Sequence, residues 1–405
     1  MVVLAPALVA QGKPKFASGS PEQQQALAQA MHENSYTLSL QDGKLSGPGM
    51  DFLAQRTEKA QFVLFGEEHF VKEFPEFLTA LFTYLHAQHG FNYLALESDP
   101  VSAEAASRPP LRGNLEAIGR YAARYPNAFT FPSDQELAMF AAVGRMSSGR
   151  TDPVWGLDQS FGVLHALDRL QALPGFRPTA KFSELRAQGA KLDLTRPDED
   201  RPDFMEKVKT SDLEELRRAM NPPAGSEAAF ILDNLISSSE IYGDYESGRY
   251  YDNGFVREEQ MKHLFLREYR AAQARGERTP KVLVKMGHWH VFRGSGPSYL
   301  QTLGNFVTEF ATANGMEAYS LGVYLRGPWR DVVQQKGLEP IALATDAGAW
   351  TIIDFRPLRA RVATGEFGKL DPTLLANIYG FDAALVLGGA TAGTDALLHP
   401  PAASK

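Results

Sequence analysis

Two apolar runs of this chain, roughly 200 residues apart, end in the same way. Residues 61–69 read QFVLFGEEH, and residues 281–290 read KVLVKMGHWH. Each run has the Val, Leu and Phe content of a buried β-strand and reaches a glycine that permits a sharp turn. Titratable side chains then replace the Ser, Asn or Lys that usually follow a strand. Because ligands bind at the carboxyl ends of strands in open α/β sheets, the two endings predict one reaction site.

The elements around the first run predict a parallel sheet. A strand over 62–66, a helix over 73–88 and a strand over 91–96 form a strand–helix–strand unit. Such units join parallel strands through a right-handed crossover. We therefore expect an α/β fold with a mainly parallel central sheet flanked by helices. Further strands are expected at 153–157, 282–286, 318–324, 351–355 and 383–387.

The other segments predict how the sheet is assembled. Asp42-Gly43, within the alternating stretch 35–49, is typical of a β-hairpin. Residues 160–277 contain no clear strand and predict a large helical insertion, or lid, in which Ser211 is the N-cap of one helix. The expected organisation is a tail or signal-peptide remnant (1–20), two parts of one α/β domain (21–159 and 278–395) around the insertion (160–277), and a flexible tail (396–405).

Composition excludes several functional classes. The 405-residue chain has 41 basic and 48 acidic residues, a net charge of −7, and no run of Lys or Arg, so neither nucleic acid nor a membrane is an expected partner. The absence of cysteine excludes disulfides, zinc–thiolate sites and cysteine nucleophiles. No serine-hydrolase elbow, P-loop, dinucleotide fingerprint or His-Glu-x-x-His motif is present. We expect a small-molecule substrate, and the sequence indicates no particular oligomeric state.

The apolar start of the chain bears on its location. Residues 1–10 resemble the end of a secretory signal with a small-residue cleavage site, but they lack its positive amino-terminal region. A periplasmic or secreted protein and a cytoplasmic protein with an ordinary tail are therefore both compatible with the sequence. No other stretch approaches the ~20 apolar residues that a transmembrane helix needs.

The first motif places His69 close to carboxylates. A histidine at a strand end can act as a general base near neutral pH if a carboxylate orients its other ring nitrogen. Glu67 and Glu68 precede it, and Glu97 ends the next strand, so all three can lie at one rim of a parallel sheet. Taken alone, a Gly-x-x-His sequence is also typical of a solvated loop. The second motif is what favours chemistry.

That second motif contains two histidines, His288 and His290. If it stays extended, both side chains point to one face, which suits two ligands of one metal or two hydrogen bonds to an oxyanion. The alternative is a pair of buried histidines packed beside Trp289. A functional role is favoured because both histidines follow the apolar run instead of lying within it.

Other candidates follow further predicted strands and one predicted helix. Asp158 follows its strand as Glu97 does, whereas Asp99, which precedes a proline, suits a helix N-cap. Arg257, at a helix start, could clamp a carboxylate or stabilise an oxyanion, or it could be a surface residue. The aromatic run that ends at Tyr251 could form a substrate wall or simply a packed loop.

In this order, the motifs resemble those of the superfamily that includes the erythromycin esterases, the ChaN-like haem-uptake proteins and the Tiki metalloproteases. The resemblance extends over about residues 50–390. It rests on Gly66-Glu67-Glu68-His69 and the later Glu76-Phe77, on Tyr93-Leu-Ala-Leu-Glu97, Gly156-Leu-Asp158-Gln159, Arg257 with Met261, His288-Trp-His290, and Gly380-Phe-Asp-Ala-Ala-Leu-Val-Leu. The first motif has the ChaN-like length, one residue shorter than is usual in erythromycin esterases, whereas the Gly-x-Asp and Arg-x-x-x-Met elements follow the esterase branch.

The resemblance implies, first, an esterase-like hydrolase. In this interpretation His69 takes a proton from a water that attacks an ester, lactone or amide carbonyl, and Glu67 or Glu97 orients the base. The oxyanion would be stabilised by His290, His288 and Arg257, directly or through a divalent metal whose candidate ligands are His69, His290 and Glu97. The expected substrate-binding residues are Glu68, Glu76, Asp158 and Tyr251.

Two alternatives use the same motifs differently. A ChaN-like protein would hold haem or a metal between the two histidine motifs without turnover, and the tyrosines of 242–251 could serve as axial ligands. A Tiki-like peptidase would require a divalent metal and a peptide substrate. The sequence alone does not choose among the three.

Overall fold

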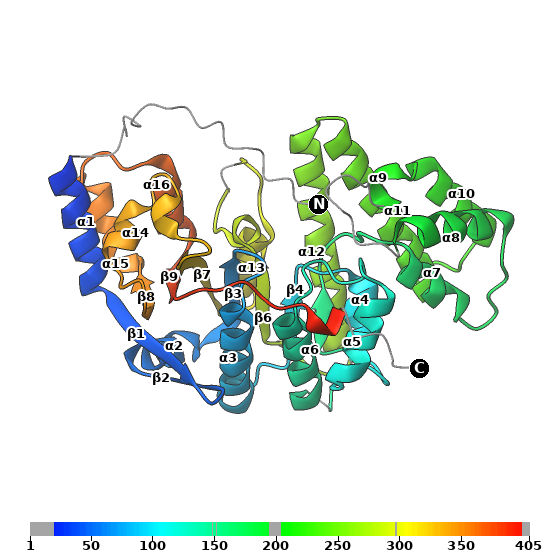
Figure 1. Cartoon of the computed structure of the whole chain (residues 1–405), viewed down its shortest axis with the longest axis horizontal. Coiled ribbons are helices and arrows are strands. Elements are labelled where there is room, and N and C mark those ends of the chain that lie inside the picture. The colour runs from blue at the N-terminus through cyan, green and yellow to red at the C-terminus, as the bar shows by residue number, and fades with distance from the viewer. Residues whose placement is uncertain (1–19, 148, 151, 194–203, 296–297, 399–405) are drawn as a thin grey trace.

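The structure is a computed structural model that describes residues 20–398, apart from 148, 151, 194–203 and 296–297. Its strands are β1 (Ser35–Gln41), β2 (Lys44–Ser46), β3 (Ala60–Glu67), β4 (Tyr93–Leu96), β5 (Val154–Gly156), β6 (Val282–Gly287), β7 (Glu317–Arg326), β8 (Trp350–Asp354) and β9 (Ala383–Gly388). They form one nine-stranded sheet in the order β2-β1-β8-β9-β7-β3-β6-β4-β5 (Figure 1).

Most of this sheet is parallel. The six strands β9-β7-β3-β6-β4-β5 pair in parallel with one another. Beyond β9, the strands β8, β1 and β2 continue the sheet in antiparallel pairs. The predicted mainly parallel α/β fold is therefore confirmed. The predicted hairpin is also present, because Asp42 (φ 49°) and Gly43 (φ 70°) form the two-residue connection from β1 to β2. Positive φ at both positions is what a type I′ turn requires.

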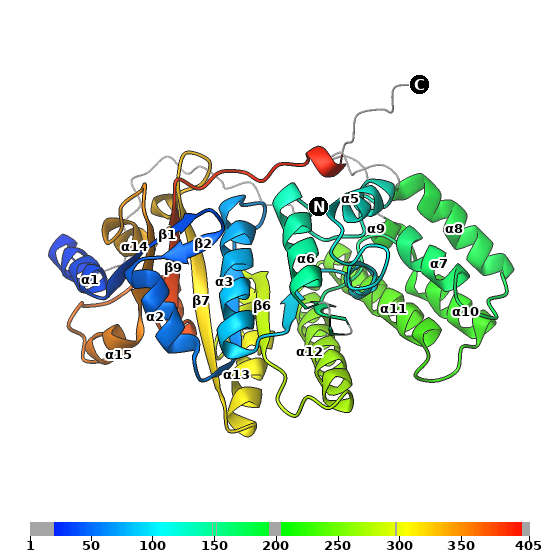
Figure 2. The same cartoon turned by 90° about the horizontal axis from the view of Figure 1, so that it is seen from below.

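Helices cover both faces of the sheet, and each face has its own hydrophobic core. The helices that contribute to the first core are α2 (Pro48–Thr57), α3 (Glu73–His89), α4 (Pro100–Ala106), α5 (Leu115–Arg124), α6 (Asp134–Met146) and the 3₁₀ turn η3 (Ala396–Leu398). The second core includes α1 (Pro21–Glu33), α12 (Tyr250–Ala274), α13 (Leu303–Ala313), α14 (Glu339–Leu343), α15 (Arg356–Ala363), α16 (Pro372–Gly380), and the 3₁₀ turns η1 (His288–Val291) and η2 (Val332–Gln334). Figure 2 shows α2, α3 and α6 side by side along the first face.

A third core lies in the helical region beyond β5. It is built by α7 (Leu164–Gln171), α8 (Ala180–Leu192), α9 (Phe204–Lys207), α10 (Thr210–Met220) and α11 (Glu227–Glu246). Figures 1 and 2 both show α12 between this group and the sheet. Because Phe265 and Tyr269 of α12 are buried in the sheet core, the last helix of the predicted insertion is part of the α/β core.

Some local expectations need correction. Ser211 is not an N-cap: α10 begins one residue earlier, and the extended Lys209 stands at the cap position. Residues 288–290 do not continue the strand but form η1. Residues 396–398, expected to belong to a flexible tail, form η3, which buries Leu398 against the first core. The rest of that predicted tail, 399–405, lies outside the described residues. The predicted tail at 1–20 lies outside the described residues except for Ser20, which caps α1.

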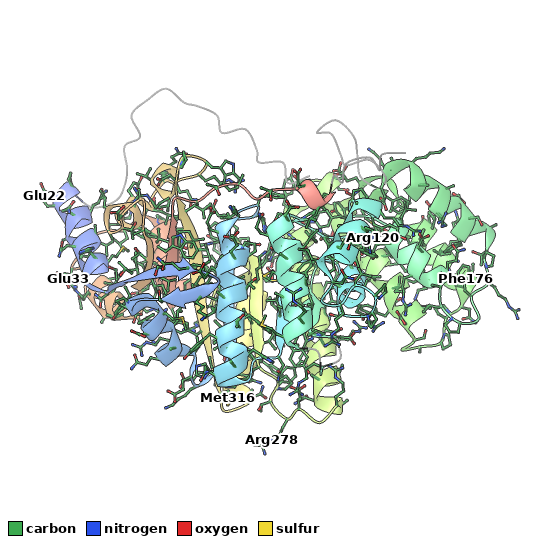
Figure 3. The ribbon with its side chains drawn as sticks, turned by 60° about the horizontal axis from the view of Figure 1, so that its bottom comes forward. Glu22, Glu33, Arg120, Phe176, Arg278 and Met316 are labelled. Carbon is green, nitrogen blue, oxygen red and sulfur yellow. The ribbon has the colours of Figure 1, made fainter. Side chains whose placement is uncertain are left out.

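The orientation of the sheet fixes where a site can form. Figure 3 labels Met316 and Arg278 at the edge where β7 and β6 begin, so the carboxyl ends of the parallel strands lie at the opposite edge. The same view labels Glu22 and Phe176 near the two ends of the long dimension of the molecule. Within the described part of the chain, no helix is both long and apolar enough to cross a membrane.

Candidate active site

The candidate site lies where four neighbouring parallel strands end. β3 ends at Glu67 and β6 ends at Gly287, and these two residues are paired in register. Glu97 directly follows β4, and Asp158 follows β5 closely. A cavity of about 720 Å³ lies at this edge and is lined by Glu67, Glu97 and Gly287. These residues converge because every parallel strand delivers its carboxyl end to the same edge of the sheet.

His69 is held from two sides. Its Nδ1 lies 3.2 Å from Oε1 of Glu67, and its ring stacks on Phe131 with 3.6 Å between centroids and 19° between planes. Glu67 is only 4% exposed, whereas His69 lines the cavity. A carboxylate can only accept a hydrogen bond, so in the neutral ring this contact favours the tautomer with its proton on Nδ1 and its lone pair on Nε2.

A buried ammonium stands behind this pair. The Nζ of Lys285, on β6, donates to Glu67 and lies 3.0 Å from Glu136 at the start of α6. Burial alone would lower the pKa of Lys285, but Glu136 and Glu67 outweigh it and raise that pKa. Burial in turn raises the pKa of Glu136 to about 7 against the opposing charge of Lys285. A continuous series of polar contacts thus connects Glu136 on α6, through Lys285 and Glu67 in the sheet, to His69.

His290 forms a second histidine–carboxylate pair. Its Nδ1 lies 2.6 Å from Oε1 of Glu258 on α12, and Oε2 of Glu258 accepts the backbone N–H of Leu303 at 2.7 Å. Burial lowers the pKa of His290, but the negative charges of Glu258 and Glu97 outweigh burial, so its pKa is raised above the ordinary value. The imidazolium form is therefore favoured at this position.

Both pairs face the carboxylate of Glu97. The Nε2 of His69 is 3.9 Å from its Oε2, and the Nε2 of His290 is 3.6 Å from its Oε1. Burial raises the pKa of Glu97, but His290, His69 and Arg257 together outweigh burial and hold that pKa well below its usual range. Glu97 is therefore a permanent negative charge between the two rings.

Arg257 and Gly287 fix the position of Glu97. The Nη2 of Arg257 donates to Glu97 at 2.7 Å, while its Nε and Nη2 bind the two oxygens of Asp158 at 2.8 and 2.7 Å. The backbone N–H of Gly287 donates to the other oxygen of Glu97. A Cβ at Gly287 would stand 2.9 Å from Glu97 Oε2 and 3.1 Å from His69 Nε2, so only glycine leaves this space open.

The structure separates the two histidines of the second motif. The Nε2 of His288 lies 2.9 Å from Oδ1 of Asn377, and its ring packs edge-on against Tyr324 and Phe381. Burial lowers its pKa. The expected common face is lost because η1 turns the chain. For His288 the alternative of a histidine packed beside Trp289 describes the geometry, whereas His290 faces Glu97.

Close backbone approaches explain that turn. A Cβ at Gly66 would lie 2.9 Å from the carbonyl oxygen of His288, and a Cβ at Gly304 would lie 2.3 Å from the carbonyl carbon of Val291. The two glycines therefore let β3 and α13 press against η1.

The four expected substrate-binding residues fall into different places. Glu68 lines the cavity, where it accepts from Gln335 and pairs with Arg330 at 3.5 Å. Asp158 is fully buried and binds Arg257, so it supports the site from behind. Glu76 is exposed on α3, and Tyr251 is 59% exposed on α12; neither lines the cavity. From the same aromatic run, Tyr242 and Tyr245 line it instead.

Several residues of the site were not identified from the sequence. Glu258 follows the predicted Arg257 directly, and this adjacency was a usable signal. Lys285 interrupts an otherwise apolar strand, which was another. Phe131 and Phe161 reach the cavity from loops and carry no local signal. Gln159, next to Asp158, lines the cavity with a buried amide oxygen that has no hydrogen-bond partner within the described structure.

The predicted metal ligands do not fit a divalent cation. No group of three or more His, Asp or Glu side chains in the described ranges has the arrangement of a metal site. The carboxylate of Glu97 is already engaged by a guanidinium and a backbone N–H. A dication on that carboxylate would face the fixed positive charge of Arg257, and the repulsion in a buried setting is strong. The hydrolytic mechanism proposed below therefore uses no metal.

Comparison with solved structures places the fold. The chain superposes on a protein described as a succinoglycan biosynthesis protein with a TM-score of 0.62 and 14% identity over 93% of this chain and all of that one. A Bacillus cereus protein from structural genomics gives a TM-score of 0.58 and 14% identity over 92% of this chain and 98% of that one. A mutant of the erythromycin esterase EreC in its open conformation gives 0.57 and 16% identity over 89% and 98%.

These likenesses show a shared fold. The predicted resemblance to the erythromycin esterases is thus confirmed at the level of architecture along nearly the whole described chain. The haem-binding ChaN of Campylobacter jejuni superposes with a TM-score of only 0.33 and 11% identity, so it supports no conclusion. No protein-family model and no curated protein sequence matches the chain.

Proposed function

We propose that this protein is a hydrolase that attacks an ester, lactone or amide carbonyl with a water activated by His69. The observation that carries the proposal is the convergence of two histidine–glutamate pairs on Glu97, inside a cavity of about 720 Å³. The fold shared with an erythromycin esterase supports a carbonyl substrate. One fold can host many activities. The proposal therefore depends mainly on the geometry of the side chains in the site and on the chemical role that each can take.

In the first step His69 acts as general base. Glu67 holds the proton on Nδ1, so the Nε2 lone pair takes a proton from water while the water oxygen bonds to the carbonyl carbon. Base catalysis of this kind contributes about 10²–10⁴-fold in rate. The stack on Phe131 keeps the ring plane fixed and reduces the entropy that orientation would cost.

The second step concerns the negative charge that develops on the carbonyl oxygen. His290 presents an Nε2–H from the opposite side of Glu97, and its raised pKa favours the imidazolium that stabilises an oxyanion. One well-placed donor of this kind contributes about 10²–10³-fold. When the tetrahedral intermediate collapses, the proton taken up by His69 passes to the leaving alkoxide or amine. Water and substrate are thereby converted to acid and alcohol, or acid and amine.

Aromatic side chains form much of the cavity wall and determine what can enter. Phe131 and Phe161 lie edge to face, as do Phe161 and Tyr242, which makes one continuous apolar surface. Trp289 and Phe70 are about half exposed at the cavity. This surface fits a substrate with an apolar body whose carbonyl reaches the polar floor.

A panel of activated esters, lactones and anilides tests the proposal. The purified protein should hydrolyse members with apolar acyl or alcohol groups, and His69→Asn should abolish turnover. His263→Asn is the matched control, because His263 is an exposed histidine on α12 outside the cavity. Wild-type rates in folded His69→Asn protein would discard the mechanism.

The same preparation decides between the alternatives. Activity that survives a chelator, in protein shown by elemental analysis to lack zinc, separates the proposed hydrolase from a metal-dependent peptidase. Haem binding would appear as a visible absorption band after haem addition that is absent from His290→Ala protein.

A further inference from the structure

Lys285 stands where a strand normally carries an apolar side chain. It is the only charged residue of β6, it is 4% exposed, and its Nζ lies 6.0 Å from the ring centroid of Phe74 in the core. Burying an ammonium costs several kcal/mol unless close partners compensate for the lost hydration. The hydrolytic steps described above make no use of this residue.

The partners of Lys285 connect it to the base. Its Nζ donates to Oε1 of Glu67, and this is the same oxygen that lies 3.2 Å from Nδ1 of His69. On its other side Nζ is 3.0 Å from Oε1 of Glu136. Glu67 and Glu136 are also buried, so water provides little screening of the charges in this hydrogen-bonded series.

The protonation state of Glu67 controls which nitrogen of His69 is free. As a carboxylate, Glu67 accepts from Nδ1–H and leaves Nε2 unprotonated. As a carboxylic acid, it would donate to Nδ1, and the proton of the neutral ring would move to Nε2. A ring of that tautomer could not take a proton from water at Nε2. Burial already raises the pKa of Glu136, the second carboxyl group beside Lys285. Without the ammonium between them, Glu136 and Glu67 would share a proton, and a shared proton lets Glu67 donate to Nδ1.

We propose that Lys285 is a positioning residue that keeps Glu67 as a hydrogen-bond acceptor and thereby holds His69 in the tautomer with its lone pair on Nε2. This inference rests on the proposed function for its catalytic meaning, but the tautomer itself is a property of the free protein. Glu136 completes the arrangement by balancing the ammonium on the side away from the cavity.

The first experiment is ¹⁵N NMR of the histidine rings, because it needs no substrate. His69 signals are assigned from the His69→Asn spectrum. In the wild type the ¹⁵N shifts should show a protonated Nδ1 and a free Nε2. In Lys285→Met the proton should move to Nε2. Lys181→Met is the matched control: Lys181 is also bridged by acids, Glu184, Asp212 and Glu215, but it lies in the helical region.

The second experiment is a double-mutant cycle on the best ester of the panel. Lys285→Met should lower kcat by about 10²-fold, the smaller end of what a general base contributes, with little change in KM. If Lys285 acts through Glu67, its substitution should have no further effect in a Glu67→Gln background. Purely structural damage would instead add to the loss in both backgrounds.

The outcomes separate the inference from the proposed function. A wild-type tautomer in folded Lys285→Met protein, or additive losses in the cycle, would overturn the role of Lys285. If Lys285→Met does not fold, Lys285→Gln, which removes the charge but keeps a hydrogen-bond donor and leaves both carboxyl groups in place, is measured instead, and the proton should again move to Nε2 of His69. Unfolding of both variants would assign Lys285 to stability alone and would also overturn the proposal. Absence of any esterase activity would remove the proposed function while the NMR result stands.

Discussion

The two histidine–glutamate pairs of the site are alike in geometry but differ in what stands behind each carboxylate. Glu67, which binds His69, shares its charge with the buried ammonium of Lys285. Glu258, which binds His290, has no ammonium beside it among the described residues and instead accepts the backbone N–H of Leu303 at 2.7 Å. A backbone dipole offsets a carboxylate far less than a full positive charge does.

This difference assigns the two rings different tasks. Where the carboxylate keeps most of its charge, the imidazolium is stabilised, and the pKa of His290 is raised accordingly. Where an ammonium shares the carboxylate, the pair can fix a tautomer without adding a full negative charge beside the ring. Glu97 stands between them and keeps both Nε2 atoms at one centre. One pair is thereby suited to accept a proton and the other to stabilise an anion.

The largest expected effect comes from removing the proton acceptor. His69→Asn should lower kcat/KM by about 10²–10⁴-fold, because it removes the Nε2 lone pair of the ring that Glu67 holds at the cavity. His290→Asn removes one oxyanion donor and should cost about 10²–10³-fold. Steady-state kinetics on both variants tests whether His69 is the base and His290 the oxyanion donor. If His69 is the base, hydroxide can replace the activated water, so activity should return at high pH in His69→Asn but not in His290→Asn. Identical pH–rate profiles for the two variants would contradict these separate roles.

A smaller loss is expected from crowding the space between the two pairs. Gly287→Ala places a Cβ 2.9 Å from Oε2 of Glu97 and 3.1 Å from Nε2 of His69. The backbone of Gly287 (φ −55°, ψ 149°) is accessible to alanine, so the effect arises from contact and not from strain. A displacement near 1 Å at a reacting group costs about 10²-fold. Gly243→Ala, with nothing within 4 Å of its Cβ, is the control and should keep full activity.

The stack on His69 should contribute less again. Phe131→Leu keeps an apolar wall but removes the ring that lies 3.6 Å from the imidazole. Aromatic pairs contribute about 0.5–1.5 kcal/mol beyond the area they bury, so kcat should fall about two- to tenfold. Because Phe131 stacks on the ring of His69, the oxyanion contribution measured with His290→Asn should stay the same in this background. A combined loss larger than the product of the two would contradict that separation.

The amino-acid sequence predicts much of this arrangement. The order of strands and helices indicated a parallel sheet, and a parallel sheet brings His69, Glu97 and Gly287 to one edge whatever the details. The same reasoning could not place Glu258, because α12 contributes to the site only through its packing against the sheet core. Nor could it place Phe131, whose loop follows α5 and has no regular spacing.

The error at His288 has a specific physical cause. A run of alternating side chains predicts an extended segment when only local preferences are considered. Here Gly66 and Gly304 allow two other segments to approach within contact distance of η1, and this tertiary packing turns the chain. The glycines were visible in the sequence, but their partners were not. Lys285 was likewise visible, and its meaning depended on Glu136, which is distant in the chain.

The smallest expected effect is on how the free energy of unfolding depends on pH through His288 and His290, the two histidines of one motif. Folding raises the pKa of His290, through Glu258 and Glu97, so this residue stabilises the protein fully below its unfolded pKa of about 6.5. That stabilisation is lost as pH rises through the folded pKa. Burial lowers the pKa of His288, so its contribution has the opposite sign and is lost as pH falls below about 6.5.

Urea unfolding of the wild type, His290→Gln and His288→Gln between pH 5 and 9 measures both contributions. The free-energy difference between wild type and His290→Gln should shrink as pH increases, and the difference for His288→Gln should grow. Parallel curves for the two variants would mean that both rings experience the same electrostatic surroundings. The assignment of His290 alone to the charged centre would then fail, and with it the distinction between a proton-accepting pair and an anion-stabilising pair.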